Sequence, residues 1–175
     1  MPEPFRAKPD AFALYTVLFL HFGGRFLLLQ RAPNKRLAPN RWTGVGGKVE
    51  AEELGDLRAS VLRELEEETN LSDDDLSNLS LRRVLYHNRA GEPLTGLLYY
   101  TADLKRYSLP ECTEGTLYWK EPRDFAALDI IETTDLVLPH LVHDMQRDPR
   151  GQERIFIGVT HYQADGTLTS LSWSA

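Results

Sequence analysis

Apolar and polar positions follow two different periodicities along the chain. Residues 12–22 and 25–31 are rich in apolar, β-branched and aromatic side chains, which is typical of strands. A Gly-Gly pair lies between these segments and supplies a turn, so the two strands are predicted to form a hairpin. Residues 32–40 then make a polar, basic loop, and the glycine-rich residues 41–47 cannot form a regular helix.

The clearest helix is predicted over residues 56–69. Apolar side chains recur at every fourth position from Leu57 to Leu65 and form one stripe on the helix surface. Asp56 near the start favours the positive end of a helix. Asn70 stands at the other end, where asparagine can adopt the left-handed conformation that closes a helix.

The second half of the chain reads as strands around one further helix. Strands are expected at residues 81–89, 96–103, 115–120, 153–162 and 167–173. A helix is expected over residues 134–147, and Pro139 should end or kink it near its first turns. No boundary divides the sequence. Mixed strands with two helices therefore predict one α/β domain of three layers over residues 1–175.

Composition limits the classes of function. A net charge of -6 disfavours a nucleic-acid polymer as the main partner. Cys112 is the only cysteine, which excludes an internal disulfide, fits a reducing cytosol and suggests a small buried residue. Residues 1–10 lack the apolar stretch of a signal peptide, and residues 12–22 are too short to span a bilayer. We therefore expect a cytoplasmic protein without a membrane partner.

Three glutamates on the first helix form the main candidate for chemistry. Glu64, Glu67 and Glu68 are spaced i, i+3, i+4 and share one helix face, whereas Glu66 points elsewhere. Each like-charged pair costs about 0.2–0.5 kcal/mol. A hard divalent cation offsets that repulsion, because Mg²⁺ prefers oxygen ligands and bridges carboxylates to phosphates. The alternative is a solvated surface helix without a ligand.

Residues around these glutamates strengthen the case for a site. Gly46 and Gly47 allow close approach of the backbone to another group. Arg63 precedes the first glutamate, and its planar guanidinium could hold a neighbouring carboxylate through two hydrogen bonds.

Residues 46–71 (GGKVEAEELGDLRASVLRELEEETNL) resemble the signature of the Nudix hydrolase family. That signature is G, five residues, E, seven residues, then R-E-U-x-E-E-x-G-U, where U is aliphatic. Gly47 and Glu53 match the first spacing, and residues 63–71 match the end.

The chain departs from this signature at two places. Nine residues rather than seven follow Glu53, which we interpret as an insertion before the helix, so Glu50 or Glu52 could take its role. Asn70 replaces the final glycine, a mild change because asparagine tolerates the left-handed conformation.

The resemblance implies both a fold and a chemistry. The fold would be an α/β/α sandwich with a central mixed sheet and a loop–helix–loop signature. Mg²⁺, or Mn²⁺ in its place, would be held by Glu64, Glu67, Glu68 and the Gly47 carbonyl. Glu64 is the candidate general base. Glu114 is the rival base and a possible further ligand, or else a plain loop carboxylate.

Resemblance outside the signature concerns the substrate. Residues 40–48 resemble the lead-in of MutT-type sanitising enzymes, whereas residues 113–119 and 153–173 resemble segments of bacterial 8-oxo-dGTP diphosphatases. These likenesses imply hydrolysis of an oxidised purine nucleoside triphosphate to the monophosphate and pyrophosphate.

Candidate substrate-binding residues each have a structural alternative. They are Arg41, Trp42, Thr43, Lys48, Thr133 and Thr134. Thr43 stands where some relatives place a base-binding asparagine. The two later threonines, with Glu132 and Asp135, could read a base edge, or a threonine could cap the helix. Trp42 and Trp119 could stack on a base or be buried. Basic side chains that could contact phosphate, or be solvated, are Lys35, Arg36, Arg41 and Lys48.

Other functions remain open at this point. Within the family, the substrate could be ADP-ribose or a dinucleoside polyphosphate. A non-catalytic nucleotide-binding module is a different class of protein, although all three signature glutamates are present. A calcium-binding surface is disfavoured, since no twelve-residue loop with alternating oxygen ligands exists. The sequence does not decide between a monomer and a homodimer.

Overall fold

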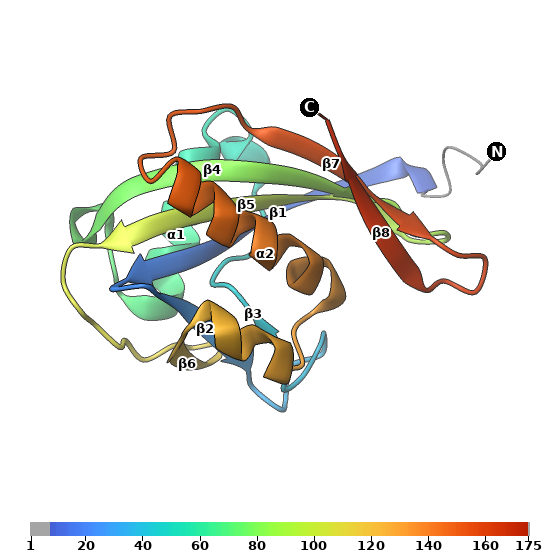
Figure 1. Ribbon diagram of the computed structural model, residues 1–175. Helices are drawn as coiled ribbons and strands as arrows, with labels where there is room; N and C mark the ends of the chain where they lie inside the picture. Colours follow the sequence, from blue (N-terminus) through green and yellow to red (C-terminus); the bar gives the residue numbers. More distant parts are fainter. Residues whose placement is uncertain (1–7, 175) are drawn as a thin grey trace.

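The computed structural model describes residues 8–174 as a mixed sheet with helices on both faces (Figure 1). The strands are β1 (Lys8–Phe22), β2 (Arg25–Arg31), β3 (Trp42–Thr43), β4 (Leu76–His87), β5 (Pro93–Leu104), β6 (Gly115–Lys120), β7 (Phe156–Tyr162) and β8 (Leu168–Trp173). The helices are α1 (Leu57–Thr69) and α2 (Glu132–Arg147), with short 3-10 helices η1 (Ala51–Glu53), η2 (Asp73–Asp75) and η3 (Pro122–Ala127). The expectation for residues 1–10 falls mostly outside the described residues.

Parallel and antiparallel strands are combined in this sheet. The strand order is β3-β2-β1-β5-β4-β7-β8, and β6 pairs with β2. β1 runs parallel to β5 and β4 runs parallel to β7, whereas the other pairs are antiparallel. The expected mixed α/β fold is therefore confirmed, while the extent of one domain over residues 1–175 stays a prediction.

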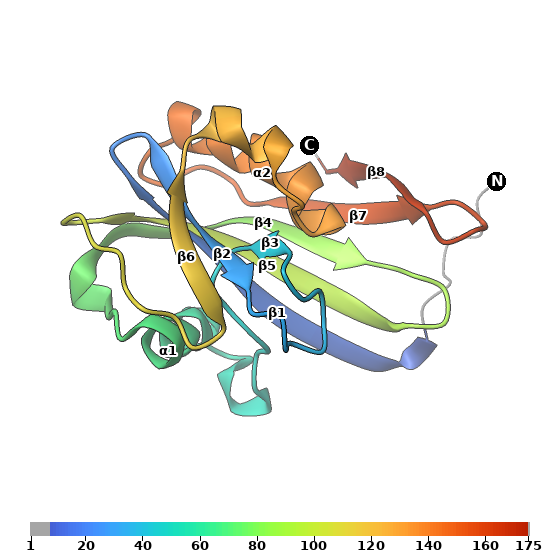
Figure 2. The same cartoon turned by 90° about the horizontal axis from the view of Figure 1, so that it is seen from below.

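Two apolar cores lie on opposite faces of the sheet. Seen from below, α1 covers one face and α2 the other (Figure 2). Val61 and Leu65 of α1 are fully buried in the first core with strand residues such as Leu18. Val137 and Leu141 of α2 occupy the second core. Burial of these stripes on both faces holds the helices in place.

Several predicted elements are confirmed closely. The first hairpin turns at Gly23 and Gly24, which both have positive φ, and β6 matches its predicted bounds. Helix α1 begins after Asp56, whose side chain accepts from the Ala59 N–H, and ends at Asn70 with φ 56°. The closing pair β7–β8 is an antiparallel hairpin.

Other expectations need correction. Helix α2 begins at Glu132 rather than at residue 134, and it continues through Pro139 instead of ending there. The Pro139 ring is exposed, so solvent can hydrate the carbonyl of the preceding turn, which lacks its usual N–H donor. Strand β7 begins at Phe156 rather than residue 153, because residues 148–155 form a connection held by Arg82. Cys112 is half-buried rather than buried.

Candidate active site

The glycine-rich loop runs beside β1 and is held by its backbone. Leu18 and Val45 exchange N–H···O bonds of 2.7 and 3.0 Å, and the Thr16 N–H donates to the Gly47 carbonyl at 2.9 Å. Gly46 has φ 145°, and a Cβ there would lie 2.2 Å from the Thr16 carbonyl oxygen. Only glycine fits this position without moving the backbone.

Gly47 brings the loop against helix α1. A Cβ at this residue would lie 2.5 Å from a carboxylate oxygen of Glu64. The missing side chain therefore allows the loop and the carboxylate to meet. This contact is the structural reason for the glycine that opens the signature.

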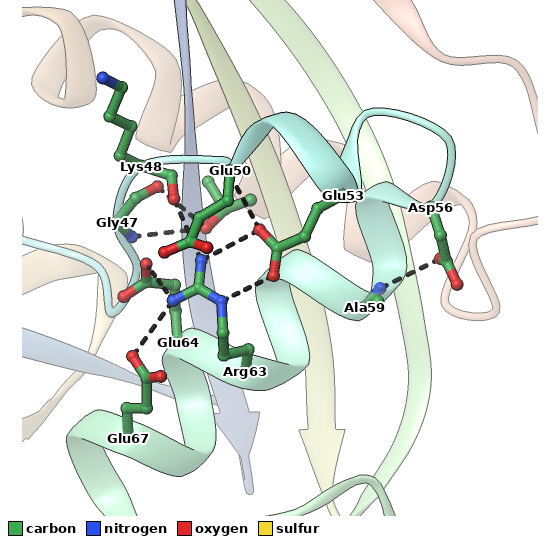
Figure 3. A network of polar contacts seen from close by, with 10 residues as sticks. Gly47, Lys48, Glu50, Glu53, Asp56, Ala59, Arg63, Glu64 and Glu67 are labelled. Atoms are coloured by element: carbon green, nitrogen blue, oxygen red, sulfur yellow. Dashed lines mark hydrogen bonds and ion pairs between the residues drawn. The ribbon is translucent and has the colours of Figure 1, made fainter.

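Arg63 is the centre of a polar network that joins the loop to the helix (Figure 3). Its guanidinium donates to Glu53 at 2.6 and 3.0 Å, in the bidentate arrangement expected from its planar shape. It also donates to Glu64 at 2.8 Å, to Glu67 at 3.1 Å and to the Lys48 carbonyl at 3.1 Å. One cation thus fixes three carboxylates and the loop.

The insertion in the signature does not displace its first glutamate. Glu53 ends η1 and meets Arg63, whereas Glu50 and Glu52 are exposed. Hydrogen bonds from Arg63 and from the Glu50 N–H hold the pKa of Glu53 at about 2. Glu53 is therefore an ionised anchor for the arginine, and the extra residues form the turn that follows η1.

Glu68 is the most deeply buried of the signature glutamates. Its exposed fraction is 7%, and its carboxylate accepts from the Gly46 N–H at 3.2 Å. Burial, followed by the charges of Glu64 and Glu114, raises its pKa to about 8 despite that hydrogen bond. Burial also raises the pKa of Glu64, although the Arg63 hydrogen bond and charge oppose the shift.

Glu67 occupies a different environment from its neighbour. Its side chain is 60% exposed and reaches Arg63 rather than the buried carboxylates. Glu66 is exposed, as its position on the helix predicted. The three candidate ligands thus share a helix face, but only Glu64 and Glu68 face the pocket described next.

A pocket of about 470 Å³ opens over these two carboxylates. Seven of the candidate catalytic, metal-binding and substrate-binding residues line it: Thr43, Gly47, Glu64, Glu68, Glu114 and the pair Thr133 and Thr134 of α2. The lining residues that the sequence did not single out include Arg31 at the end of β2 and Tyr99 on β5. The pocket therefore joins a carboxylate end to a wall made by the sheet and α2.

Tyr99 and the threonines form the inner wall of the pocket. The Tyr99 hydroxyl lies 3.4 Å from Thr134 Oγ1, and burial raises the Tyr99 pKa to about 12. Neither threonine caps the helix, because Ile131 occupies the N-cap position. Tyr99 stands in a continuous apolar strand, so no sequence signal distinguished it from a core residue.

The remaining candidates do not line this pocket. Arg41 bonds to Glu132 at 2.9 Å and to the Ile130 carbonyl at 2.7 Å, which ties the loop to the start of α2. Trp42 is buried in the second core. The Lys48 side chain is exposed and points away from the Arg63 network (Figure 3).

Three further candidates also lie apart from the pocket. Trp119 packs against the first core and donates to the Ser108 carbonyl at 2.9 Å, so burial describes it better than stacking. Asp135 and Arg36 are exposed.

The pocket carboxylates suit a divalent cation that is shared with a ligand. Among the described side chains, those of residues 12–174, no three acidic, histidine or cysteine groups close around one point. Mg²⁺ does not need such a cage, because it is usually held by one or two carboxylates together with waters and substrate phosphates. Glu64 provides a half-buried carboxylate and Glu68 a buried one, and Glu68 has no cation in hydrogen-bond contact. The donor set therefore fits the ion.

Comparison with known proteins agrees with this geometry. Residues 13–150 match the NUDIX domain model, so the chain belongs to the Nudix family. Members of this family hydrolyse pyrophosphate bonds in nucleotide substrates and generally use divalent metal ions. A search of curated proteins finds no significant match.

Solved structures show the same fold at low sequence identity. A mutator MutT protein from Bacillus halodurans is 23% identical, with TM-score 0.65 over 92% of this chain and 97% of that one. A C. elegans Ap4A hydrolase is 22% identical, with TM-score 0.58 over 81% and 98%. A bifunctional NMN adenylyltransferase/ADP ribose pyrophosphatase from Francisella tularensis is 19% identical, with TM-score 0.62 over 81% and 42%. These likenesses show the fold alone.

No helix among residues 8–174 has the length and apolar character needed to cross a bilayer.

Proposed function

We propose that the chain is a MutT-type, magnesium-dependent diphosphatase of nucleoside triphosphates. The substrate class is an oxidised purine nucleotide such as 8-oxo-dGTP, and the products are the monophosphate and pyrophosphate. One observation carries the proposal: a single pocket joins the carboxylates of Glu64 and Glu68 to an aromatic and hydroxyl-lined wall at Tyr99 and Thr134. A nucleotide has phosphates at one end and a flat base at the other. The phosphates would lie at the carboxylates and the base against the opposite wall.

The carboxylate end is proposed to hold the cation and the phosphates. Glu64 and Glu68 would bind Mg²⁺ with the Gly47 carbonyl, and Glu67 would join them by turning from Arg63. When bound, Mg²⁺ neutralises phosphate charge and acidifies a water molecule. Arg63 would keep the carboxylates in position, since its hydrogen bonds to Glu53 and Glu64 fix the loop–helix junction.

Glu64 is the proposed general base. It faces the pocket, and its carboxylate accepts a hydrogen bond from Arg63 and lies against Gly47, which has no side chain. A base must lie within hydrogen-bond reach of the proton that it accepts, and the pocket end of Glu64 offers that access. The rival base Glu114 also lines the pocket, but Lys35 holds its carboxylate at 2.6 Å.

The wall opposite the carboxylates is proposed to bind the base. Thr133 and Thr134 line this wall, and Tyr99 supports Thr134 from the core through its hydroxyl. A threonine hydroxyl can donate or accept a hydrogen bond, so it can follow either edge of a purine. Thr43 lines the same pocket from the loop side. Such a wall gives less discrimination between bases than an amide or a carboxylate, whose donors and acceptors are fixed.

A substrate panel tests this proposal. Purified protein with Mg²⁺ is incubated with 8-oxo-dGTP, dGTP, ADP-ribose and diadenosine polyphosphates, and the products are quantified. Glu67→Gln and Glu66→Gln are compared, because these adjacent exposed glutamates differ in contact with Arg63. We expect 8-oxo-dGTP to be cleaved fastest, with a loss of rate only in Glu67→Gln. Faster cleavage of another compound would overturn the substrate, and tight binding without turnover would indicate a binding module.

A further inference from the structure

A partly exposed ion pair joins Lys35 to Glu114, which lines the pocket. The Lys35 ammonium donates to a Glu114 carboxylate oxygen at 2.6 Å, and the two side chains are 27% and 30% exposed. The backbone fixes this meeting, because the Ala32 N–H donates to the Glu114 carbonyl at 3.0 Å and the Lys35 N–H donates to the Ala32 carbonyl at 3.1 Å. The lysine is therefore presented to the glutamate by a turn of the loop.

The pocket carboxylates differ in how firmly a cation holds them. Glu64 is bonded to Arg63, which also binds Glu53, Glu67 and a loop carbonyl and so cannot leave without breaking the network. Among residues 12–174, whose side chains are described, the ammonium of Lys35 makes one hydrogen bond, to Glu114. A lysine side chain is a flexible stem with a strongly hydrated charge, so it can swing into water while the backbone stays in place.

We propose that Lys35 is a built-in counter-ion for Glu114, which it releases when a divalent cation enters the pocket. The inference rests on the proposed function, because it takes the carboxylate end as the cation site. Glu64, Glu68 and Glu114 all line the pocket. The negative charges of Glu64 and Glu114 also disfavour ionisation of Glu68, so the three carboxylates repel one another. Lys35 offsets part of their repulsion in the metal-free protein, and the cation replaces it there.

The exchange has a further consequence for substrate binding. If Glu114 served as a ligand of the cation, the Lys35 ammonium would be left beside the pocket residue without its anionic partner. Phosphate oxygens of an arriving nucleotide supply that partner. Lys35 is thus a positioning residue for both the metal-binding carboxylate and the phosphates. A purely structural role, in which the pair only fastens the loop, predicts no effect on metal affinity.

Titration of Mn²⁺ by calorimetry, without nucleotide, separates these roles. The wild type is compared with Lys35→Met and with Arg36→Met, a matched control that removes the same charge from an exposed neighbour. The same two substitutions are repeated in a Glu114→Gln background. We expect Lys35→Met to tighten Mn²⁺ binding by about two- to fivefold, the range for loss of a partly exposed ion pair. In Glu114→Gln it should have no more effect than Arg36→Met.

Each outcome decides the inference. Unchanged affinity in Lys35→Met, or an equal gain in Arg36→Met or in the Glu114→Gln background, would overturn the exchange and leave the proposed function standing. Failure of every variant and of the wild type to bind Mn²⁺ would overturn the proposed cation site itself. Circular dichroism checks that each variant is folded, and Lys35→Gln replaces Lys35→Met if the latter is not.

Discussion

Glu68 should destabilise the protein when no divalent cation is present. Its carboxylate is 7% exposed and is bonded to the Gly46 N–H, without a cation in contact. A buried carboxylate that lacks a counter-ion is costly to ionise. Glu68→Gln removes the charge, and its side-chain oxygen can still accept from the Gly46 N–H.

The magnitude follows from the pKa of the buried group. Folding raises the Glu68 pKa from its ordinary value of 4.5 to about 8, so the folded protein binds this proton more tightly than the unfolded chain. Stability is therefore full below pH 4.5 and falls as the pH rises toward 8. Each pH unit in this window costs about 1.4 kcal/mol, which gives a penalty of about 3 kcal/mol at pH 7.

Thermal unfolding in a metal chelator measures this penalty between pH 5 and pH 8. At pH 7, Glu68→Gln should be more stable than the wild type by about 3 kcal/mol, or roughly 6–12 °C in Tm for a protein of this size. The difference should shrink to about 1 kcal/mol at pH 5. Glu66→Gln, an exposed glutamate on the same helix, serves as the control and should change little at any pH.

Saturating Mg²⁺ should narrow or reverse the difference in stability between Glu68→Gln and the wild type, because the cation stabilises only a protein that binds it. A Glu68→Gln variant that is less stable than the wild type at pH 7 without metal ions would refute the penalty for the buried charge. A pH-independent difference between the two proteins would also contradict it, since the penalty depends on ionisation of Glu68.

Three other substitutions test the close contact at Gly47, the hydrogen bonds of Arg63 and the buried ion pair between Arg83 and Asp144. Gly47→Ala should lower kcat/KM by at least about 100-fold, because its methyl would lie 2.5 Å from a Glu64 carboxylate oxygen; an active variant would contradict the tight contact. Arg63→Lys should lower kcat/KM about 10- to 100-fold with little change in Tm, since lysine cannot reproduce the bidentate hold; full activity would oppose a positioning role. Asp144→Ala should lower the free energy of unfolding by about 3–5 kcal/mol in urea titrations, because it leaves the buried Arg83 unpaired; a loss below about 1 kcal/mol would contradict this.

Local signals explain why helix α1 was predicted closely. The four-residue spacing of its apolar positions, the capping Asp56 and the left-handed Asn70 all act within a few residues of one another. Strand β4 was predicted five residues too short at its start, because its pairing with β5 contains two irregularities that interrupt the alternation of side chains. The second irregularity, between Leu81 and Arg83, leaves the consecutive residues Arg82 and Arg83 both buried, which no simple periodicity predicts.

The site was predictable as a motif but not as a geometry. Helical spacing places both Glu67 and Glu68 near Glu64, yet Glu67 is largely exposed and Glu68 is buried. That difference depends on where the loop at Gly46 packs against the helix. Tyr99 and the Lys35 contact with Glu114 depend on segments far apart in the chain, so a local pattern does not reveal them.

Mg²⁺-dependent cleavage of a nucleoside triphosphate, directed by the pocket carboxylates, is the activity that we propose. Its most direct test is chromatographic measurement of the products formed from 8-oxo-dGTP by the wild type and by Glu64→Gln. We expect equal amounts of 8-oxo-dGMP and pyrophosphate, formed only with the divalent cation, and a rate at least about 100-fold lower in the variant. Equal rates for the two proteins, or release of the diphosphate and inorganic phosphate instead, would contradict it.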